Sequence, residues 1–363
     1  MEKDKDVVIT KEQYKKINNY LNNVCLILSE DDSFYLNNIG TLSMLCNEII
    51  KLLSEYNIKN ENNEDCFTFL EIYEKAKEII RKIEPKYLDD FSKIIDNGIL
   101  TADYDRLEIP YNKRKRGYSF YTNKDNNIHI NDSFNYDAIP TLIHEYFHKT
   151  NYSKYKVRYL LTEFISIYFE LLTYEYLKND VTIKEKLNLG DRICYLNEAA
   201  NNIYDNSFYI FVFEKFGNID DNTYELIKKY KIINPDNYTE NMFKKDLLDR
   251  LDEVEILEKK YNDSDELKKE YNSFDVFFAE KFREYRYFIG ILFAYYSLYN
   301  ASKEKMLILN EKLKNNETAS LDDALNLVGI SLSDEFIENA IQSIKRYIEE
   351  NKLDKKDEDV KKM

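Results

Sequence analysis

A long apolar segment near the middle of the chain most constrains its fold. From Ser153 to Leu177 apolar side chains occur on almost every side of a helix, which predicts a helix that is buried all round. Glu163, Ser166 and Glu170 interrupt it at spacings of three and four residues, which place them on one helix face. An ionised carboxylate in apolar surroundings is costly unless it is paired or bound to a metal, so this face needs a partner.

The pentapeptide HEYFH, residues 144–148, lies just upstream and offers such a partner. The whole chain has three histidines, and His144 and His148 are two of them. Residues four apart share a helix face, so each of the two rings can direct one nitrogen at a common ion. The HExxH spacing on a helix is typical of zinc hydrolases, in which the glutamate acts as a general base.

We therefore predict a site for one zinc ion per chain. Its ligands are expected to be His144, His148 and Glu163, which leaves the fourth position for water. Glu145 stands beside the ion and is expected to act as the general base that deprotonates this water. Because a purely structural zinc site has no use for a base there, Glu145 favours a catalytic role.

The other polar residues of the apolar segment are expected to lie behind the ligands. Glu170 would accept the remaining ring N–H of a ligand histidine, and Ser166 would lie in the same outer layer. The alternative is that Glu163 and Glu170 only pair with buried tyrosines or lysines. The coincidence of two histidines with two inward carboxylates favours the metal site.

The rest of the chain is predicted to be mainly helical. With Gly 7 and Pro 4 it has few of the residues that turn-rich β folds require. Helical periodicity extends from about residue 10 to 97, where three or four packed helices are expected, and again over 183–350. The one hairpin signal precedes HEYFH, with strand-like residues at 117–121 and 128–130 around a polar turn.

The net charge and the cysteine pattern limit which partners and which cellular compartment we expect. A net charge of −15 argues against nucleic acid or an anionic membrane as partner. The four cysteines have no framework spacing and are expected to be reduced. No signal peptide or apolar run of membrane-spanning length is visible, so we expect a soluble cytoplasmic protein; the oligomeric state stays open.

Several segments resemble the thimet oligopeptidase and oligoendopeptidase F family of zinc metallopeptidases. LTEFISIYFE (161–170) resembles the E-x-x-S-x-x-x-E helix of that family, and REYRYFIGILFA (283–294) resembles its Y-x-Y-x-x-G segment. Residues 115–131 are similar to the hairpin before its HExxH helix, and residues 320–350 to its C-terminal ending. The segments occur in the family's order and cover about residues 100–350.

The resemblance implies a mainly α fold, a helical zincin with one small β-hairpin before the metal-binding helix, which hydrolyses short peptides. Tyr285 or Tyr287 would donate a hydrogen bond to the tetrahedral oxyanion. Tyr118, Ser119 and Phe120 in the hairpin would pair with the substrate backbone as an added strand. The expected domains are an N-terminal helical lobe (1–97), the zincin catalytic domain (98–350) and a charged tail (351–363).

Some positions depart from the family pattern. Phe147 stands where the family usually has glycine in HExxH, and Phe277 where it usually has a further histidine. The connection from His148 to Glu163 and the N-terminal lobe are also shorter than in the family.

The main alternative function is therefore that of a zinc-binding relative with altered or lost catalysis that acts as a binding module. A toxin-like protease, suggested by DVFFAEKF (275–282), is a third reading.

Overall fold

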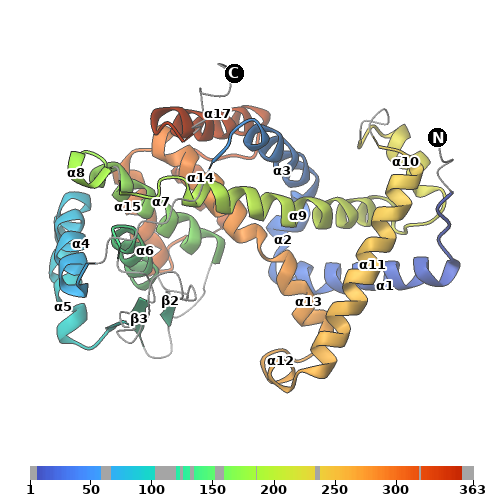
Figure 1. Ribbon diagram of the computed structural model, residues 1–363, viewed down its shortest axis with the longest axis horizontal. Coiled ribbons are helices and arrows are strands. Elements are labelled where there is room, and N and C mark those ends of the chain that lie inside the picture. The colour runs from blue at the N-terminus through green and yellow to red at the C-terminus, as the bar shows by residue number, and fades with distance from the viewer. Residues whose placement is uncertain are drawn as a thin grey trace, which may run out of the picture. The chain divides into compact units, whose positions relative to one another are not determined.

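The computed structural model in Figure 1 places most of the chain. The residues it describes are 6–58, 67–102, 120–122, 126–130, 135–151, 159–184, 186–233, 238–318 and 320–353.

The described chain falls into two compact units, each built from separate stretches of sequence. Unit 1 comprises Met1–Glu48 and Ala200–Tyr285, and unit 2 comprises Ile49–Ala199 and Arg286–Met363. The predicted boundary at residue 97 differs from this division. A helix ends at Asp96 and Gly98 after it adopts a positive φ of 64°, but unit 2 continues through this position.

Among its described residues unit 1 has helices and no strands, and α1, α11 and α13 pack against one another within it. Its helices are α1 (Lys11–Asp31), α2 (Ser33–Asn37), the start of α3 (Ile39–Ser54), the end of α9 (Asp191–Phe216), α10 (Thr223–Lys229), α11 (Glu240–Asp263), α12 (Asp265–Glu270) and α13 (Phe274–Phe282).

Unit 2 is built around a pair of neighbouring helices, α6 (Ala138–Asn151) and α7 (Tyr159–Leu177). Helices α4 (Phe69–Ile83) and α15 (Lys303–Lys314) also pack against α6. The remaining helices of this unit are the end of α3, the 3-10 turn η1 (Pro85–Tyr87), α5 (Leu88–Asp96), α8 (Val181–Lys184), the start of α9, α14 (Tyr285–Asn300), α16 (Leu321–Leu327) and α17 (Asp334–Glu350).

A small sheet of three strands in the order β1-β3-β2 packs on α6. Strand β2 (Phe120–Thr122) pairs antiparallel with β3 (Asn127–Ile130), with Phe120 opposite His129. Strand β1 (Leu100–Ala102) pairs with β3 in parallel. Ile128 and Ile130 alternate with His129 and point into the core, which anchors the sheet beneath α6.

The predicted mainly α fold with a small sheet before the metal-binding helix is confirmed. Two details were wrong. Five α-helices occupy the described part of residues 10–97, because Asp32 ends α1 and a short α2 follows. The parallel strand β1 was not predicted, since three residues give too short a pattern to recognise.

Among the described residues, no helix combines the length and the apolar character needed to span a bilayer.

Candidate metal centre

Aromatic packing fixes α6 against α7 and orients its polar face. The ring of Phe147 stacks on Phe169 of α7, with centroids 3.7 Å apart and planes 10° from parallel. Tyr87 meets the same Phe147 ring edge-on at 5.9 Å. Phe147 is fully buried, so its ring fills the space between α6 and α7 and holds the two helices together.

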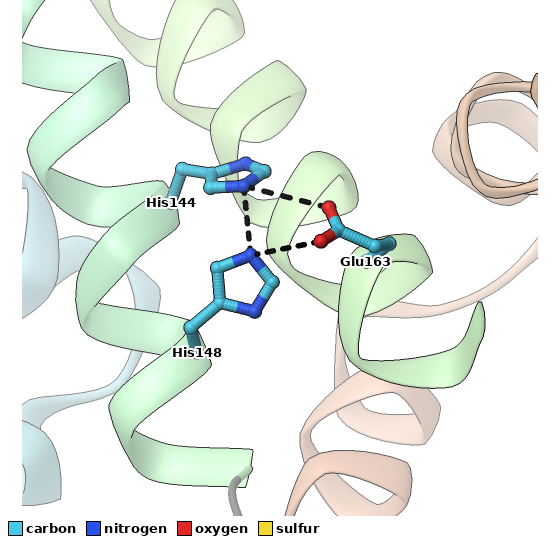
Figure 2. Close-up of side chains that lie close together, drawn as sticks. All are labelled: His144, His148 and Glu163. Carbon is cyan, nitrogen blue, oxygen red and sulfur yellow. Dashed lines mark hydrogen bonds and ion pairs between the residues drawn. The ribbon is translucent and has the colours of Figure 1, made fainter. Parts of the chain in front are cut away.

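Three side chains converge between α6 and α7. Figure 2 shows His144 and His148 extending from one helix toward Glu163 on the other. The two Nε2 atoms lie 3.0 Å apart, and they lie 3.8 Å (His144) and 3.5 Å (His148) from the Glu163 oxygens. These side chains form a group that could hold a metal ion, and in the described part of the chain it is the one such group.

The chemistry of this donor set fits a metal ion. Ligands about 2.0–2.2 Å from one tetrahedral ion lie about 3.3–3.6 Å from each other. One ligand atom from each of the three side chains lies within 4.8 Å of the other two, so small side-chain rotations would bring them around one ion. The Glu163 carboxylate is largely buried, and its Oε2 atom has no hydrogen-bond partner within the described residues. Burial opposes its charge, but His148 and His144 outweigh burial and lower the pKa of Glu163.

Glu145 follows His144 on α6 and is buried, with 6% of its surface exposed. Burial raises the pKa of this carboxyl, and the neighbouring histidines oppose the shift without cancelling it. A carboxylate with a raised pKa is a better proton acceptor, which suits a general base. Glu145 lies between His144 and His148 in the sequence of α6, and both histidines act electrostatically on its carboxyl group.

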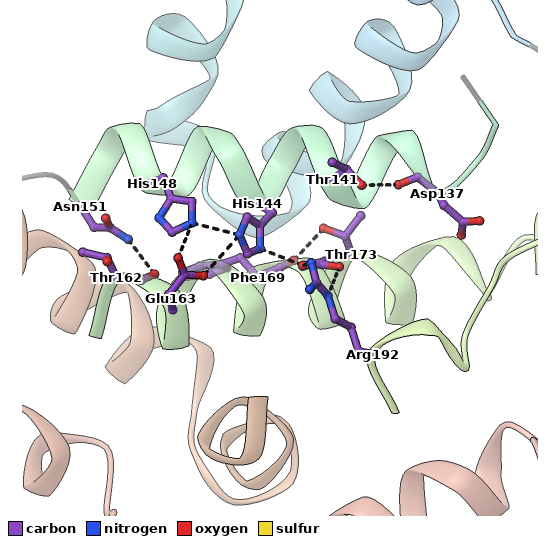
Figure 3. A network of polar contacts seen from close by, with 11 residues as sticks. Asp137, Thr141, His144, His148, Asn151, Thr162, Glu163, Phe169, Thr173 and Arg192 are labelled. Carbon is purple, nitrogen blue, oxygen red and sulfur yellow. Dashed lines mark hydrogen bonds and ion pairs between the residues drawn. The ribbon is translucent and has the colours of Figure 1, made fainter. Parts of the chain in front are cut away.

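Behind the histidines lies a buried ion pair that sequence reasoning recognised only in part. Oε2 of Glu170 lies 2.8 Å from Nδ1 of His144, the nitrogen that faces away from His148. Arg192, in the first turn of α9, donates to Glu170 through Nε (2.7 Å) and Nη2 (2.6 Å). Burial opposes ionisation, but Arg192 and His144 outweigh it and lower the pKa of Glu170 to about 2. Figure 3 shows Arg192 pointing into the network of polar contacts that includes His144.

Sequence reasoning missed Arg192. One signal was available: Arg192 opens a helix some twenty residues after Glu170, and a buried carboxylate requires a cation. The sequence does not say which of the many basic residues supplies it.

The two candidate tyrosines have different surroundings. Tyr285 belongs to unit 1, is buried, and donates from its hydroxyl to Oδ1 of Asp32 at 2.6 Å. Tyr287 belongs to unit 2 and is 39% exposed. The charge of Glu163, followed by burial, raises the pKa of Tyr287, so its hydroxyl lies within electrostatic reach of the metal group. Tyr195 meets the Tyr287 ring edge-on at 6.0 Å.

Gly290 lies where α14 packs closely against α7. A β-carbon at position 290 would lie 3.3 Å from the backbone nitrogen of Phe164 and 3.5 Å from Cβ of Glu163. The glycine therefore lets α14 approach α7 directly beside Glu163. Tyr287 lies three residues earlier, on the same side of α14.

The remaining predicted site residues are less well defined. Tyr118 and Ser119 lie outside the described residues, and Phe120 forms backbone pairs in β2 opposite His129. Ser166 is fully buried on α7, and its hydroxyl has no hydrogen-bond partner in the described part of the structure. Roles in substrate pairing and around the ligands stay predictions for these residues.

Comparisons with known proteins give one distant likeness. No protein-family model matches the chain, and no curated protein matches its sequence. The fold is similar to a crystal structure from Bacillus anthracis str. Ames that is assigned as an oligoendopeptidase F, with a TM-score of 0.46 and 13% identity. The match covers 94% of this chain but only 58% of that one. At this distance the likeness carries no argument about activity, which depends on the site itself.

Proposed function

We propose that the protein is a helical zincin, a zinc-dependent metallopeptidase that hydrolyses short peptides. The observation that carries the proposal is the convergence of His144, His148 and Glu163, with Glu145 buried beside them. Two imidazole nitrogens and one carboxylate are the donor set of many catalytic zinc sites, which keep a position open for water or substrate.

The three ligands would hold the zinc ion through Nε2 of each histidine and the carboxylate of Glu163. When bound, zinc acts as a Lewis acid that polarises the peptide carbonyl and lowers the pKa of water. Glu145 would take the proton from the attacking water and pass it to the leaving amine, for which its raised pKa suits it. Tyr287 would donate a hydrogen bond to the oxyanion as negative charge develops there.

Peptides suit this site as substrates because β2 pairs only with β3 in the described sheet. The other edge of β2 could bind an extended peptide backbone as an added strand.

The decisive experiment measures metal and activity together. Purified protein should contain about one zinc per chain, and a chelator should remove both the zinc and the hydrolysis of quenched fluorescent peptides. Glu145→Gln should retain the zinc and lose hydrolysis by about 10²-fold or more. Absence of zinc that cannot be restored by adding it would refute the proposal. Zinc binding without hydrolysis of any peptide in a diverse library would instead support a binding module.

A further inference from the structure

The buried ion pair between Glu170 and Arg192 has a geometry that acts on one ligand histidine. Glu170 accepts two hydrogen bonds from the Arg192 guanidinium, and its Oε2 atom also receives the N–H on Nδ1 of His144. Glu170 is 3% exposed and the Arg192 side chain 21% exposed, so water competes little for these bonds. A bidentate pair of this kind fixes the plane of the carboxylate as well as its charge.

The orientation of the carboxylate decides which nitrogen of His144 can bind a metal. A proton held on Nδ1 by Glu170 leaves the lone pair on Nε2, and Nε2 is the atom that faces His148 and Glu163. If Glu170 rotated or became neutral, this tautomer would lose its support. Arg192 prevents both changes without touching the metal group itself.

The balance of charges around the site also supports a role for Arg192 in the metal centre. Glu145, Glu163 and Glu170 carry three negative charges when ionised, and a divalent ion supplies two positive charges. Arg192 supplies the third, and the hydrogen bonds that it donates here go to Glu170. Without it, the buried cluster would keep one uncompensated carboxylate, which is costly in a low-dielectric interior.

We propose that Arg192 is a positioning residue for the metal centre: it locks Glu170, and through Glu170 it fixes the tautomer and ring orientation of His144. This inference rests on the proposed metal-binding function.

The test is a double-mutant cycle read as zinc affinity, measured by competition with a calibrated chelator. Wild-type affinity comes first, because a wild type that binds no zinc defeats the proposed function rather than this inference. Arg192→Met should weaken zinc binding by about 10–100-fold, the range for residues that orient a ligand from behind. Arg346→Met is the matched control, since Arg346 pairs with Glu350 on an exposed face of α17; it should keep wild-type affinity.

The cycle then separates a role through Glu170 from a general effect on folding. In a Glu170→Gln background, Arg192→Met should cause little further loss of affinity, because the carboxylate through which Arg192 acts is already gone. Cobalt-loaded Arg192→Met should also show an altered visible absorption spectrum, which reports ligand geometry. Unchanged zinc affinity in Arg192→Met would overturn the inference. So would a double variant whose fold-loss of zinc affinity equals the product of the losses in Arg192→Met and Glu170→Gln. If Arg192→Met does not fold, the same criteria apply to Arg192→Lys. That variant keeps the positive charge but loses the bidentate hydrogen bonds to Glu170.

Discussion

The Nε2 atoms of His144 and His148 lie 3.0 Å apart and face each other between α6 and α7. Two neutral imidazoles at this distance can share one hydrogen bond, whereas the nearby Glu163 has an oxygen with no partner among the described residues. The arrangement therefore brings together three electron-pair donors that one cation could bind.

Glu163 and Glu170 should differ sharply in their effect on metal binding. Glu163 faces both histidine Nε2 atoms, whereas Glu170 contacts the Nδ1 side of His144. Glu163→Ala should abolish stoichiometric zinc binding, and Glu170→Ala should weaken it by about 10–100-fold yet still load at saturating zinc. Glu175→Ala is the control, because this carboxylate on α7 pairs with Lys178 away from the metal group. Retention of zinc by Glu163→Ala together with its loss from Glu170→Ala would reverse the two roles.

The stabilisation by zinc should grow with pH. In the metal-free protein burial lowers the pKa of His148, but Glu163 and the other nearby carboxylates outweigh burial and raise it. The stability gained from protonated His148 is therefore complete below the ordinary histidine pKa of about 6.5 and is lost as pH rises through the raised value. Zinc binds only the deprotonated ring, so its affinity rises over the same window.

The measurement is the change in Tm on adding zinc to chelator-treated protein between about pH 6 and about pH 8. The shift should increase with pH in the wild type. His129→Gln removes the third histidine, which bonds to Thr101 in the sheet, and should keep the full pH dependence. A zinc-induced shift of equal size across the range would contradict this account.

The sequence predicted the convergence of His144, His148 and Glu163 because their spacing on each helix is regular. The i, i+4 histidines and the carboxylates on one face of an apolar helix limit their partners to a neighbouring helix, and α6 and α7 are that pair. Arg192 could not be found in this way, since no periodicity links it to Glu170. The distinction between Tyr285 and Tyr287 also needed the structure: two residues apart on a helix, they point about 160° apart.

The division into units shows a second limit of the sequence. Helical periodicity is the same in both units, so it does not reveal that residues 200–285 join the first 48 residues. Packing between segments far apart in the chain sets that division, as when Tyr14 of α1 bonds to Asp221. Local patterns predict the elements but not these long-range partners.

Gly290 should be intolerant of larger side chains because of its contact with α7. Gly290→Val would place carbon atoms against the backbone of Phe164 and Cβ of Glu163, and helix backbone cannot move aside as a flexible side chain can. We expect a loss of about 1–3 kcal/mol in the free energy of unfolding, measured by denaturant titration, with weaker zinc binding. Gly329→Ala gives a comparison in which strain at a φ of 80° costs stability without contact with the metal helices. Wild-type stability and zinc affinity in Gly290→Val would show that α14 does not constrain Glu163.

Removal of the hydroxyl from Tyr287 should lower activity, whereas removal of the hydroxyl from Tyr285 should lower stability. Tyr287→Phe keeps the ring against Tyr195 but removes the hydroxyl near Glu163; kcat/KM for peptide hydrolysis should fall by about 10²-fold with unchanged zinc content and Tm. Tyr285→Phe keeps the ring stacked on Tyr35 at 4.3 Å but leaves buried Asp32 without one of its donors. That change should lower the free energy of unfolding by about 1–3 kcal/mol and leave kcat/KM near the wild-type value. Wild-type kcat/KM in Tyr287→Phe, with a large loss in Tyr285→Phe, would transfer the oxyanion role from one tyrosine to the other.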